Sequence, residues 1–336
     1  MSTKICVVGT TSWGTTLAIL EARNGLDVYL WARTPEVAEE IRLKRENTSI
    51  LPGVTLPEGI TITHDMDEAM DAASAVIFAV PSQTMRHNCE LALPYLNRST
   101  LVISAAKGLE LDTNLRMSQV MSQVLYHPVS TICVLSGPNL ASEIARGLPS
   151  ASVLACQRVW LAEKAANALS APLFRLIPED DVIGVELAGS LKNIVALGAG
   201  VTDGLGLGDN AKAIVITQGW AEITRLATAL GATPATFSGL AGIGDLIATC
   251  ASPLSRNHYY GEQLAKGRSL EQIAASTPHV GEGVPTTKVA YELAQQMHIE
   301  TPIMRLMYRL LYEGLRPQQA MKDFMDITAR IAGKVA

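Results

Sequence analysis

The chain has 336 residues, of which 48% are hydrophobic and 18% are charged, and its formal net charge is −5. This length and composition predict a large buried core, two domains rather than one, and no extended disorder. The acidic balance and the lack of a long basic run argue against a nucleic-acid groove or a basic membrane patch. An anionic ligand then has to be bound by a few placed cations.

The cysteines are dispersed along the chain at apolar positions, and none of them form a Cys-x-x-Cys pair: Cys6, Cys89, Cys133, Cys156 and Cys250. An odd number of scattered cysteines predicts reduced, buried thiols. The first strand begins without a charged segment ahead of it, and no uninterrupted apolar run approaches ~18 residues. We therefore expect a cytoplasmic protein without stable membrane insertion. No histidine or cysteine cluster has metal-ligand spacing, so we expect no metal.

The first expected strand, Ile5–Val8, runs directly into a glycine turn and a helix of small residues from about Ser12. Such a unit points backbone N–H groups and a helix N-terminus at one place, which suits a pyrophosphate. Gly9 supplies the tight turn and Gly14 lets the helix pack closely. Thr11 stands where the fingerprint has its middle glycine, although its hydroxyl could donate to a phosphate. A glycine turn without a ligand would look similar.

The first half of the chain alternates apolar strands with helical stretches such as Glu36–Arg45 and Leu115–Leu125. Strands that are apolar at every position are typical of a sheet covered on both faces. The further expected strands are Val28–Trp31, Ala75–Val80, Leu101–Ser104, Thr131–Leu135 and Ala151–Ala155. The alternation predicts an α/β fold with a doubly wound, Rossmann-like, mostly parallel sheet over residues 1–183.

Cations and a turn follow three of these strands. Arg33 follows the second strand, where an acid commonly binds the ribose of NAD, and an arginine favours the 2′-phosphate of NADP without forbidding NAD. Lys107 follows another strand, at the sheet edge where ligands gather in open α/β folds. The turn Ser136–Glu143 has a helix-capping pattern, and its N–H groups suit an anion. An ordinary solvated side chain is the alternative at Arg33 and at Lys107.

From about residue 184 the strand patterns end, which predicts an all-helical second domain over residues 184–336. The expected helices are Val185–Ala199, Asn210–Leu230, Arg256–Lys266, Thr286–Gln296 and Pro302–Glu313. The glycine-rich segment Asp203–Lys212 is expected to form a turn in which Asn210 caps the next helix. This turn either closes over a site or only joins two helices.

Lys192 lies in a helix of small and apolar residues, Glu186–Asn193. Burial there disfavours an ammonium charge, which suits a general base near neutral pH. A lysine that reaches water from a buried helix is the alternative. Asp245 is expected at a helix start after two glycines, with Thr249 on the same helix face four residues later. A plain N-cap is the alternative for Asp245.

Arg256 and Asn257 are expected at the opening of a later helix, just after Ser255. A guanidinium, a side-chain amide and free backbone N–H groups together make a phosphate clamp. The glycine segment around Glu282 shows by itself only a tight turn.

These motifs, in this order and over nearly the whole chain, resemble those of the bacterial-type NAD(P)-dependent glycerol-3-phosphate dehydrogenases. The resemblance is carried by NTSILPGVTLP from Asn47, AVPSQ from Ala79, Lys107-Gly108, SGPNLASE, ELAGSLKN, DGLGLGDNAK, GIGDLIATC, Ser255-Arg256-Asn257 and EGV from Glu282. It implies an enzyme that interconverts dihydroxyacetone phosphate and sn-glycerol 3-phosphate by hydride transfer with NADP or NAD. It also implies a role in phospholipid synthesis and a homodimer.

The resemblance implies roles for individual residues. The implied catalytic residues are Lys192, which transfers the proton, Lys107 and Asp245. The implied substrate site comprises Lys107, Gly137, Asn139, Lys192, Asn193, Asp245, Thr249, Ser255, Arg256 and Asn257. The implied cofactor site comprises Gly9, Thr11, Ser12, Trp13, Gly14, Arg33, Lys107, Ala141, Arg256, Val280 and Glu282. Two positions depart from the family pattern: Asn139 stands where serine or threonine is more usual, and Thr11 replaces a glycine.

Two other functions remain open. A two-domain hydroxyacid dehydrogenase with a helical second domain and a catalytic lysine would bind a carboxylate at Arg256 and Asn257. A non-catalytic NADP-binding sensor would account for Thr11. The joint presence of Lys192, Asp245 and Arg256 argues against such a sensor.

Overall fold

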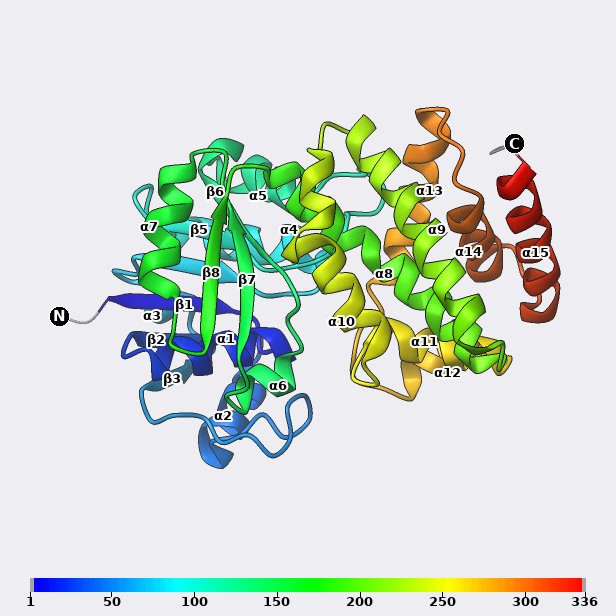
Figure 1. Ribbon diagram of the computed structural model, residues 1–336. Coiled ribbons are helices and arrows are strands. Elements are labelled where there is room, and N and C mark those ends of the chain that lie inside the picture. The colour runs from blue at the N-terminus through cyan, green and yellow to red at the C-terminus, as the bar shows by residue number, and fades with distance from the viewer. Residues whose placement is uncertain (1–2, 334–336) are drawn as a thin grey trace. The chain divides into compact units, whose positions relative to one another are not determined.

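The computed structural model describes residues 3–333 and divides into two compact units (Figure 1). The sheet unit runs from the N-terminus to Lys107 and from Leu115 to Glu186, and the helical unit consists of Gly108–Asn114 and of the chain from Leu187 onward. The boundary expected between residues 183 and 184 falls inside helix α8 (Val182–Gly204). The chain therefore passes between the two units three times.

The sheet unit contains an eight-stranded sheet in the order β3-β2-β1-β4-β5-β6-β7-β8. Its strands are β1 (Lys4–Val8), β2 (Asp27–Trp31), β3 (Ile60–Thr63), β4 (Ala75–Phe78), β5 (Leu101–Ser104), β6 (Ile132–Ser136), β7 (Ser150–Ala155) and β8 (Phe174–Glu179). All neighbouring strands pair in parallel except β6 and β7, which pair antiparallel. The predicted Rossmann-like, mostly parallel sheet is confirmed. In this strand order, dinucleotides bind beyond the carboxyl ends of the strands near β1 and β4.

Helices connect the strands and cover both faces of the sheet. They are α1 (Ser12–Arg23), α2 (Pro35–Lys44), α3 (Met66–Met70), α4 (Met85–Ala92), α5 (Met117–Leu125), α6 (Ala141–Ala145) and α7 (Val159–Leu169). Alternate residues of β1 enter two separate cores: Ile5 lies with Leu17 of α1, and Cys6 lies with Met121 of α5. Because both faces are covered, the inner strands are apolar at most positions, which is why their sequences predict them.

The two strands that the sequence analysis missed, β3 and β8, are the two edge strands of the sheet. In β8, Phe174 and Leu176 are buried while Arg175 and Ile177 are exposed. An edge strand is less fully covered than an inner strand, so β8 lacks a continuous apolar run. Strand β3 is only four residues long and is half threonine.

The helical unit confirms the predicted all-helical second domain. Its helices are α8 (Val182–Gly204), α9 (Gly208–Ala229), α10 (Asp245–Ala251), α11 (Arg256–Ala265), α12 (Leu270–Ala275), α13 (Gly283–Gln296), α14 (Pro302–Tyr312) and α15 (Pro317–Gly333). By length and composition α8 could cross a membrane, but 94% of its most apolar window is buried inside the protein. It also carries Glu186 and Lys192, so α8 is a core helix.

Two helix starts differ from expectation. Helix α9 begins at Gly208, so Asn210 lies inside its first turn and does not cap it. Helix α13 begins at Gly283, so Glu282 occupies a helix N-cap rather than a simple turn. Helix α8 extends to Gly204 and takes up the start of the glycine-rich segment. The remaining connection to α9 is therefore short.

The five cysteines are all buried and unpaired, as predicted. Burial raises the pKa of the Cys6 thiol to about 12, against a weaker opposing effect of Lys4. Burial likewise raises the pKa of Cys250 to about 12. These two thiols are therefore protonated at neutral pH and behave as small apolar side chains.

Candidate active site

The turn between β1 and α1 requires both of its glycines. Gly9 has a φ of +111°, a backbone region that disfavours other residues. A Cβ atom at Gly9 would lie 2.8 Å from Val80 Cγ1, and one at Gly14 would collide with the Gly9 carbonyl oxygen. Helix α1 can therefore approach the ends of β1 and β4 closely, as a dinucleotide-binding turn needs.

Thr11, the departure from the glycine pattern, is held by two hydrogen bonds. Its hydroxyl donates to the Ala79 carbonyl oxygen at 2.7 Å and accepts from the Gly14 N–H at 3.0 Å. Thr11 is therefore the N-cap of α1 and also ties the turn to the segment after β4. Because the hydroxyl proton is already donated to Ala79, the N–H groups of Ser12 and Trp13 are the donors that this turn offers to an anion.

Asn47 supports the same turn and was missed by the sequence analysis. Its side-chain N–H group donates to the Thr10 carbonyl oxygen at 2.8 Å and to the Thr15 hydroxyl at 2.9 Å. The residue is 4% exposed, so both bonds are protected from water. Asn47 is far from the turn in sequence, and its place in the run NTSILPGVTLP is the only signal that could have identified it.

The other expected cofactor residues of the sheet unit lie near this turn or at neighbouring strand ends. Ala141 begins α6, and its carbonyl oxygen accepts a hydrogen bond from Thr16 of α1 at 3.1 Å. The buried Trp13 ring meets Phe174 edge to face, with centroids 6.2 Å apart, and its indole N–H has no partner among the described residues. Arg33 is exposed just beyond β2. These positions fit a bound nucleotide.

Lys107, Gly137 and Asn139 come together at the ends of β5 and β6. The Lys107 ammonium donates to the Gly137 carbonyl oxygen at 2.7 Å. The Asn139 side-chain oxygen accepts from the Ser152 hydroxyl at 2.5 Å, while its buried NH₂ group lacks a partner in the part of the chain described. A buried donor without an acceptor is costly, so this amide is suited to a ligand oxygen.

In the helical unit, Lys192 is 5% exposed and forms an ion pair with Asp245, which is 1% exposed. The Lys192 ammonium lies 2.5 Å from Asp245 Oδ1 and also donates to the Thr249 hydroxyl. The Lys192 cluster (Lys192, Asp245 and Thr249) brings together three residues that the resemblance places in one site, and in it the Asp245 carboxylate pairs with the ammonium. An ammonium has three N–H donors, so these two bonds leave one donor for a ligand.

The segment before α10 explains why Asp245 is available to Lys192. A π-helical turn, Leu240–Gly244, precedes the helix, and a Cβ atom at Gly242 would collide with the Phe237 carbonyl oxygen. Gly244 is the N-cap, and Asp245 is the first residue of α10. The simple N-cap alternative for Asp245 is therefore wrong. The four-residue spacing from Asp245 to Thr249 does place both side chains on Lys192, as expected.

Ser255 caps α11 by accepting a hydrogen bond from the His258 N–H at 3.3 Å. Arg256 and Asn257 therefore occupy the first turn of this helix, as predicted. The Arg256 side chain is exposed to solvent. An arginine stays charged under all ordinary conditions, so a cation is open to an anionic ligand here.

Asn193 and Asn257, which follow Lys192 and Arg256 in the chain, both lie against Gly283. The Asn257 side-chain oxygen accepts from the Gly283 N–H at 2.9 Å. A Cβ atom at Gly283 would lie 2.8 Å from the Asn193 carbonyl oxygen and 3.0 Å from Asn257 Oδ1. Glycine at position 283 thus allows α8, α11 and α13 to converge. The exposed Val280 lies in the segment just before α13.

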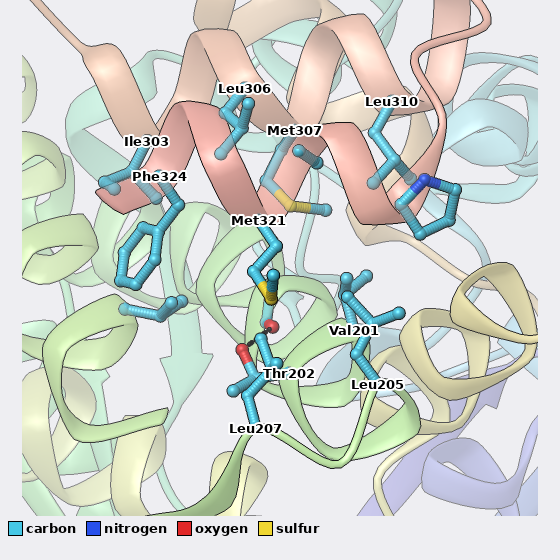
Figure 2. Close-up of a pocket in the computed structure, with 14 residues that line it drawn as sticks. Val201, Thr202, Leu205, Leu207, Ile303, Leu306, Met307, Leu310, Met321 and Phe324 are labelled. Carbon is cyan, nitrogen blue, oxygen red and sulfur yellow. Dashed lines mark hydrogen bonds between the residues drawn. The ribbon is translucent and has the colours of Figure 1, made fainter. Parts of the chain in front are cut away.

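A hollow elsewhere in the helical unit is not part of this site (Figure 2). Its lining is apolar except for Thr202, whose hydroxyl donates to the Gly198 carbonyl oxygen at 2.8 Å. Its volume of about 40 Å³ is far below that of an apolar cavity able to admit benzene, ~150 Å³. The lining includes none of the expected site residues. This hollow suits neither a phosphate nor a nucleotide.

Two sequence models of one protein family match the chain. The model described as NAD-dependent glycerol-3-phosphate dehydrogenase N-terminus matches residues 4–162, and the model described as the C-terminus of the same enzyme matches residues 181–322. Together these two matches cover most of the chain.

Individual relatives and a solved structure agree with these matches. A protein of Dehalococcoides mccartyi named glycerol-3-phosphate dehydrogenase [NAD(P)+] is 50% identical over 335 residues, 98% of this chain and 93% of its own length. A protein of the same name from Chlorobium phaeobacteroides is 46% identical over 324 residues, 96% of this chain and 97% of its own. The crystal structure of glycerol-3-phosphate dehydrogenase from Coxiella burnetii superposes with a TM-score of 0.91 at 34% identity, covering 96% of this chain and 99% of that one.

Proposed function

The chain belongs to the NAD-dependent glycerol-3-phosphate dehydrogenase family, and on this premise we propose how its residues perform the reaction. The protein is an NAD(P)-dependent oxidoreductase that interconverts sn-glycerol 3-phosphate and dihydroxyacetone phosphate. The assignment of roles rests on the buried Lys192 cluster. Asn193, which follows Lys192 in the chain, and Asn257 of the phosphate clamp both lie against Gly283.

The β1–α1 turn fits a dinucleotide. Gly9 and Gly14 leave space that a Cβ atom would fill, and the first turn of α1 offers the N–H groups of Ser12 and Trp13 to a phosphate. When bound, the nicotinamide cofactor supplies or accepts the hydride at C2 of the substrate. The exposed guanidinium of Arg33 supports a preference for NADP over NAD, because it can pair with a 2′-phosphate.

Lys192 transfers the proton. During reduction the C2 oxygen of the ketone gains negative charge, and the remaining N–H of the Lys192 ammonium donates its proton to that oxygen. Asp245 and Thr249 orient the ammonium through their hydrogen bonds. In the reverse direction, neutral Lys192 accepts the proton of the C2 hydroxyl group. Lys107 is assigned as a second cation that stabilises the charge on this oxygen.

Arg256 and Asn257 bind the substrate phosphate with the N-terminal N–H groups of α11. Binding energy gained at the phosphate holds C2 at a fixed distance from Lys192, so remote contacts lower the barrier of the chemical step. The buried, unpartnered amide of Asn139 supports a further contact to a substrate oxygen.

The enzyme is proposed to work in the cytoplasm as a homodimer and to supply glycerol 3-phosphate for phospholipid synthesis. Five buried, unpaired cysteines support a reducing compartment. Size-exclusion chromatography with light scattering tests the dimer, and a single-chain mass would contradict it.

Initial rates with each reduced nicotinamide cofactor test the activity. Dihydroxyacetone phosphate is expected to be reduced, and small keto acids of similar size without a phosphate are expected not to react. Preferred turnover of a keto acid would favour a hydroxyacid dehydrogenase instead.

Lys192→Ala tests the proton transfer. We expect kcat to fall by about 10²–10⁴-fold, the usual contribution of a general acid, with NADPH binding retained. The matched control is Lys266→Ala, which removes an exposed lysine of the same unit and is expected to leave kcat unchanged. Binding of NADPH without turnover in the unaltered protein would indicate a sensor.

A further inference from the structure

Helices α8 and α11 approach so closely that their backbones touch. A Cβ atom at Gly200 of α8 would collide with the His258 carbonyl oxygen, and one at Gly261 of α11 would collide with the Leu197 carbonyl oxygen. A Cβ atom at Gly204, one turn further along α8, would meet the Ala265 methyl group at 2.6 Å. At this crossing each helix therefore presents a glycine directly to the backbone of the other.

One polar pair lies at this crossing. His258 Nε2 donates to Asp203 Oδ2 at 2.8 Å, and His258 is 9% exposed. Asp203 also accepts from the ammonium of Lys212, on α9, at 3.0 and 3.1 Å. These hydrogen bonds from His258 and Lys212 outweigh partial burial and keep the pKa of Asp203 below its ordinary value. Asp203 is therefore a carboxylate that joins α8, α9 and α11.

His258 and the phosphate clamp lie on the same turn of α11. Arg256 and Asn257 immediately precede His258, and Ser255 caps this turn through the His258 N–H. A rotation of α11 about its axis would carry Arg256 with it. Asp203 and His258 thus connect the clamp to helix α8, which also bears Lys192.

We propose that Asp203 and His258 are positioning residues for substrate phosphate binding. Their hydrogen bond fixes the register of α11 against α8, and so fixes the place of Arg256 relative to Lys192. The inference rests on the proposed function. It also gives the glycine-rich segment Asp203–Lys212 a role: its two ends hold the helix that binds the phosphate, whereas Gly206 and Gly208 serve the short connection to α9.

His258→Leu removes the hydrogen bond and keeps a buried side chain of similar size. We expect KM for dihydroxyacetone phosphate to rise about ten-fold, the loss typical of one hydrogen bond to a charged group. We expect kcat and the KM for NADPH to change less than two-fold. His258→Gln retains a side-chain N–H donor and is expected to restore most of the KM. A merely structural role would lower stability without this selective effect on KM.

Glu262→Gln is the matched control. Glu262 lies one turn along α11, and its Oε1 is 3.8 Å from His258 Nδ1, which is within ion-pair distance but beyond hydrogen-bond distance, so this variant tests the nearby charge without the bond to Asp203. We expect its KM to equal that of the unaltered enzyme. The double variant Asp203→Leu with His258→Leu is expected to raise KM no further than the larger single effect, because either change alone already removes the bond between Asp203 and His258. Asp203→Leu also removes the bonds to Lys212 and is expected to be the larger single effect. Additive effects would overturn the pairing.

Hydrogen exchange of the α11 amides gives a readout that does not depend on activity. We expect faster exchange in the first turn of α11 in His258→Leu and normal exchange in His258→Gln. If His258→Leu changes neither the exchange of α11 nor KM, the positioning role is wrong. The proposed function would still hold in that case, provided that the unaltered enzyme reduces dihydroxyacetone phosphate. An unaltered enzyme inactive on dihydroxyacetone phosphate would contradict the proposed function, and the exchange result would still decide whether the pair orders α11.

Discussion

The β1–α1 turn of the sheet unit and the Lys192 cluster of the helical unit hold their polar groups in different ways. At the turn, Thr11 replaces a glycine, and its hydroxyl is satisfied by the adjacent Ala79 carbonyl oxygen and Gly14 N–H. In the cluster, Lys192 and Asp245 are charged and almost fully buried, and each depends on the other. At the turn, nearby backbone groups satisfy the hydrogen-bonding groups of the substituted side chain. In the cluster, a substitution of either partner leaves a buried charge unpaired.

This comparison predicts where the molecule tolerates change. Neutral hydrogen bonds contribute about 0.5–1.5 kcal/mol each, whereas removing one partner of a buried ion pair costs about 3–5 kcal/mol. We therefore expect small, graded effects on the nucleotide side and large effects around Lys192.

Asp245→Ala is expected to have the largest effect on stability. The variant leaves the Lys192 ammonium buried without its carboxylate, so the free energy of unfolding should fall by about 3–5 kcal/mol. The double variant Asp245→Leu with Lys192→Met replaces the pair by apolar side chains and should regain most of that stability. Urea unfolding measures both. A loss below about 1 kcal/mol in Asp245→Ala would remove the contrast between the two regions.

Arg256→Ala is expected to raise KM for dihydroxyacetone phosphate by roughly 10–100-fold, because a charge-assisted contact to the phosphate is lost. The free energy of unfolding should change little, since the Arg256 side chain is exposed. Arg305→Ala, at an exposed position on α14, is the control and should leave KM unchanged. A similar KM in both variants would contradict the phosphate clamp.

Arg33→Asp is expected to lower the ratio of kcat/KM with NADPH to kcat/KM with NADH by about ten-fold. The carboxylate repels a 2′-phosphate and accepts hydrogen bonds from a ribose hydroxyl. Arg42→Asp, on the neighbouring helix α2, makes the same charge change and should leave the ratio as it is. An unchanged ratio in Arg33→Asp would mean that Arg33 does not select the cofactor.

Thr11→Gly is expected to have the smallest effect. Loss of the helix cap and of the bond to Ala79 should lower the free energy of unfolding by about 1 kcal/mol. Removal of the branched side chain should tighten NADPH binding a few-fold, as calorimetry would show. Thr11→Ser retains both hydrogen bonds and should match the unaltered protein in stability. Weaker NADPH binding in Thr11→Gly would show that the threonine shapes the turn for the cofactor.

Local patterns in the sequence predict the inner parts of the fold well. Strand β4 is apolar at every position and β1 at every position after Lys4, because both faces of the sheet are covered, and both strands are found where expected. The edge strand β8 alternates buried and exposed residues, so its sequence carries a weaker signal. The start of α9 was misplaced because Asn210 has the chemistry of a cap while the chain already turns helical at Gly208.

The candidate site likewise has some features that follow from local sequence and others that do not. The spacing of Asp245 and Thr249 on one helix face, and the place of Arg256 in a first helical turn, follow from residues close in sequence. The pairing of Lys192 with Asp245 joins residues 53 positions apart, and that of Asp203 with His258 joins residues 55 apart. No local periodicity encodes such pairs. The family resemblance placed Lys192 and Asp245 in one site, whereas the pairing of Asp203 with His258 is shown only by the packing of the helices.

The short segment Gly108–Asn114 belongs to the helical unit although it lies far from the rest of that unit in sequence. The Ser190 hydroxyl of α8 donates to its Gly108 carbonyl oxygen at 3.3 Å. An engineer who cut the gene once, near codon 184, would therefore separate the helical fragment from seven of its own residues. Chimeras with a related enzyme should exchange 108–114 together with the C-terminal half, because otherwise the residue that follows Lys107 would face a surface from a different parent.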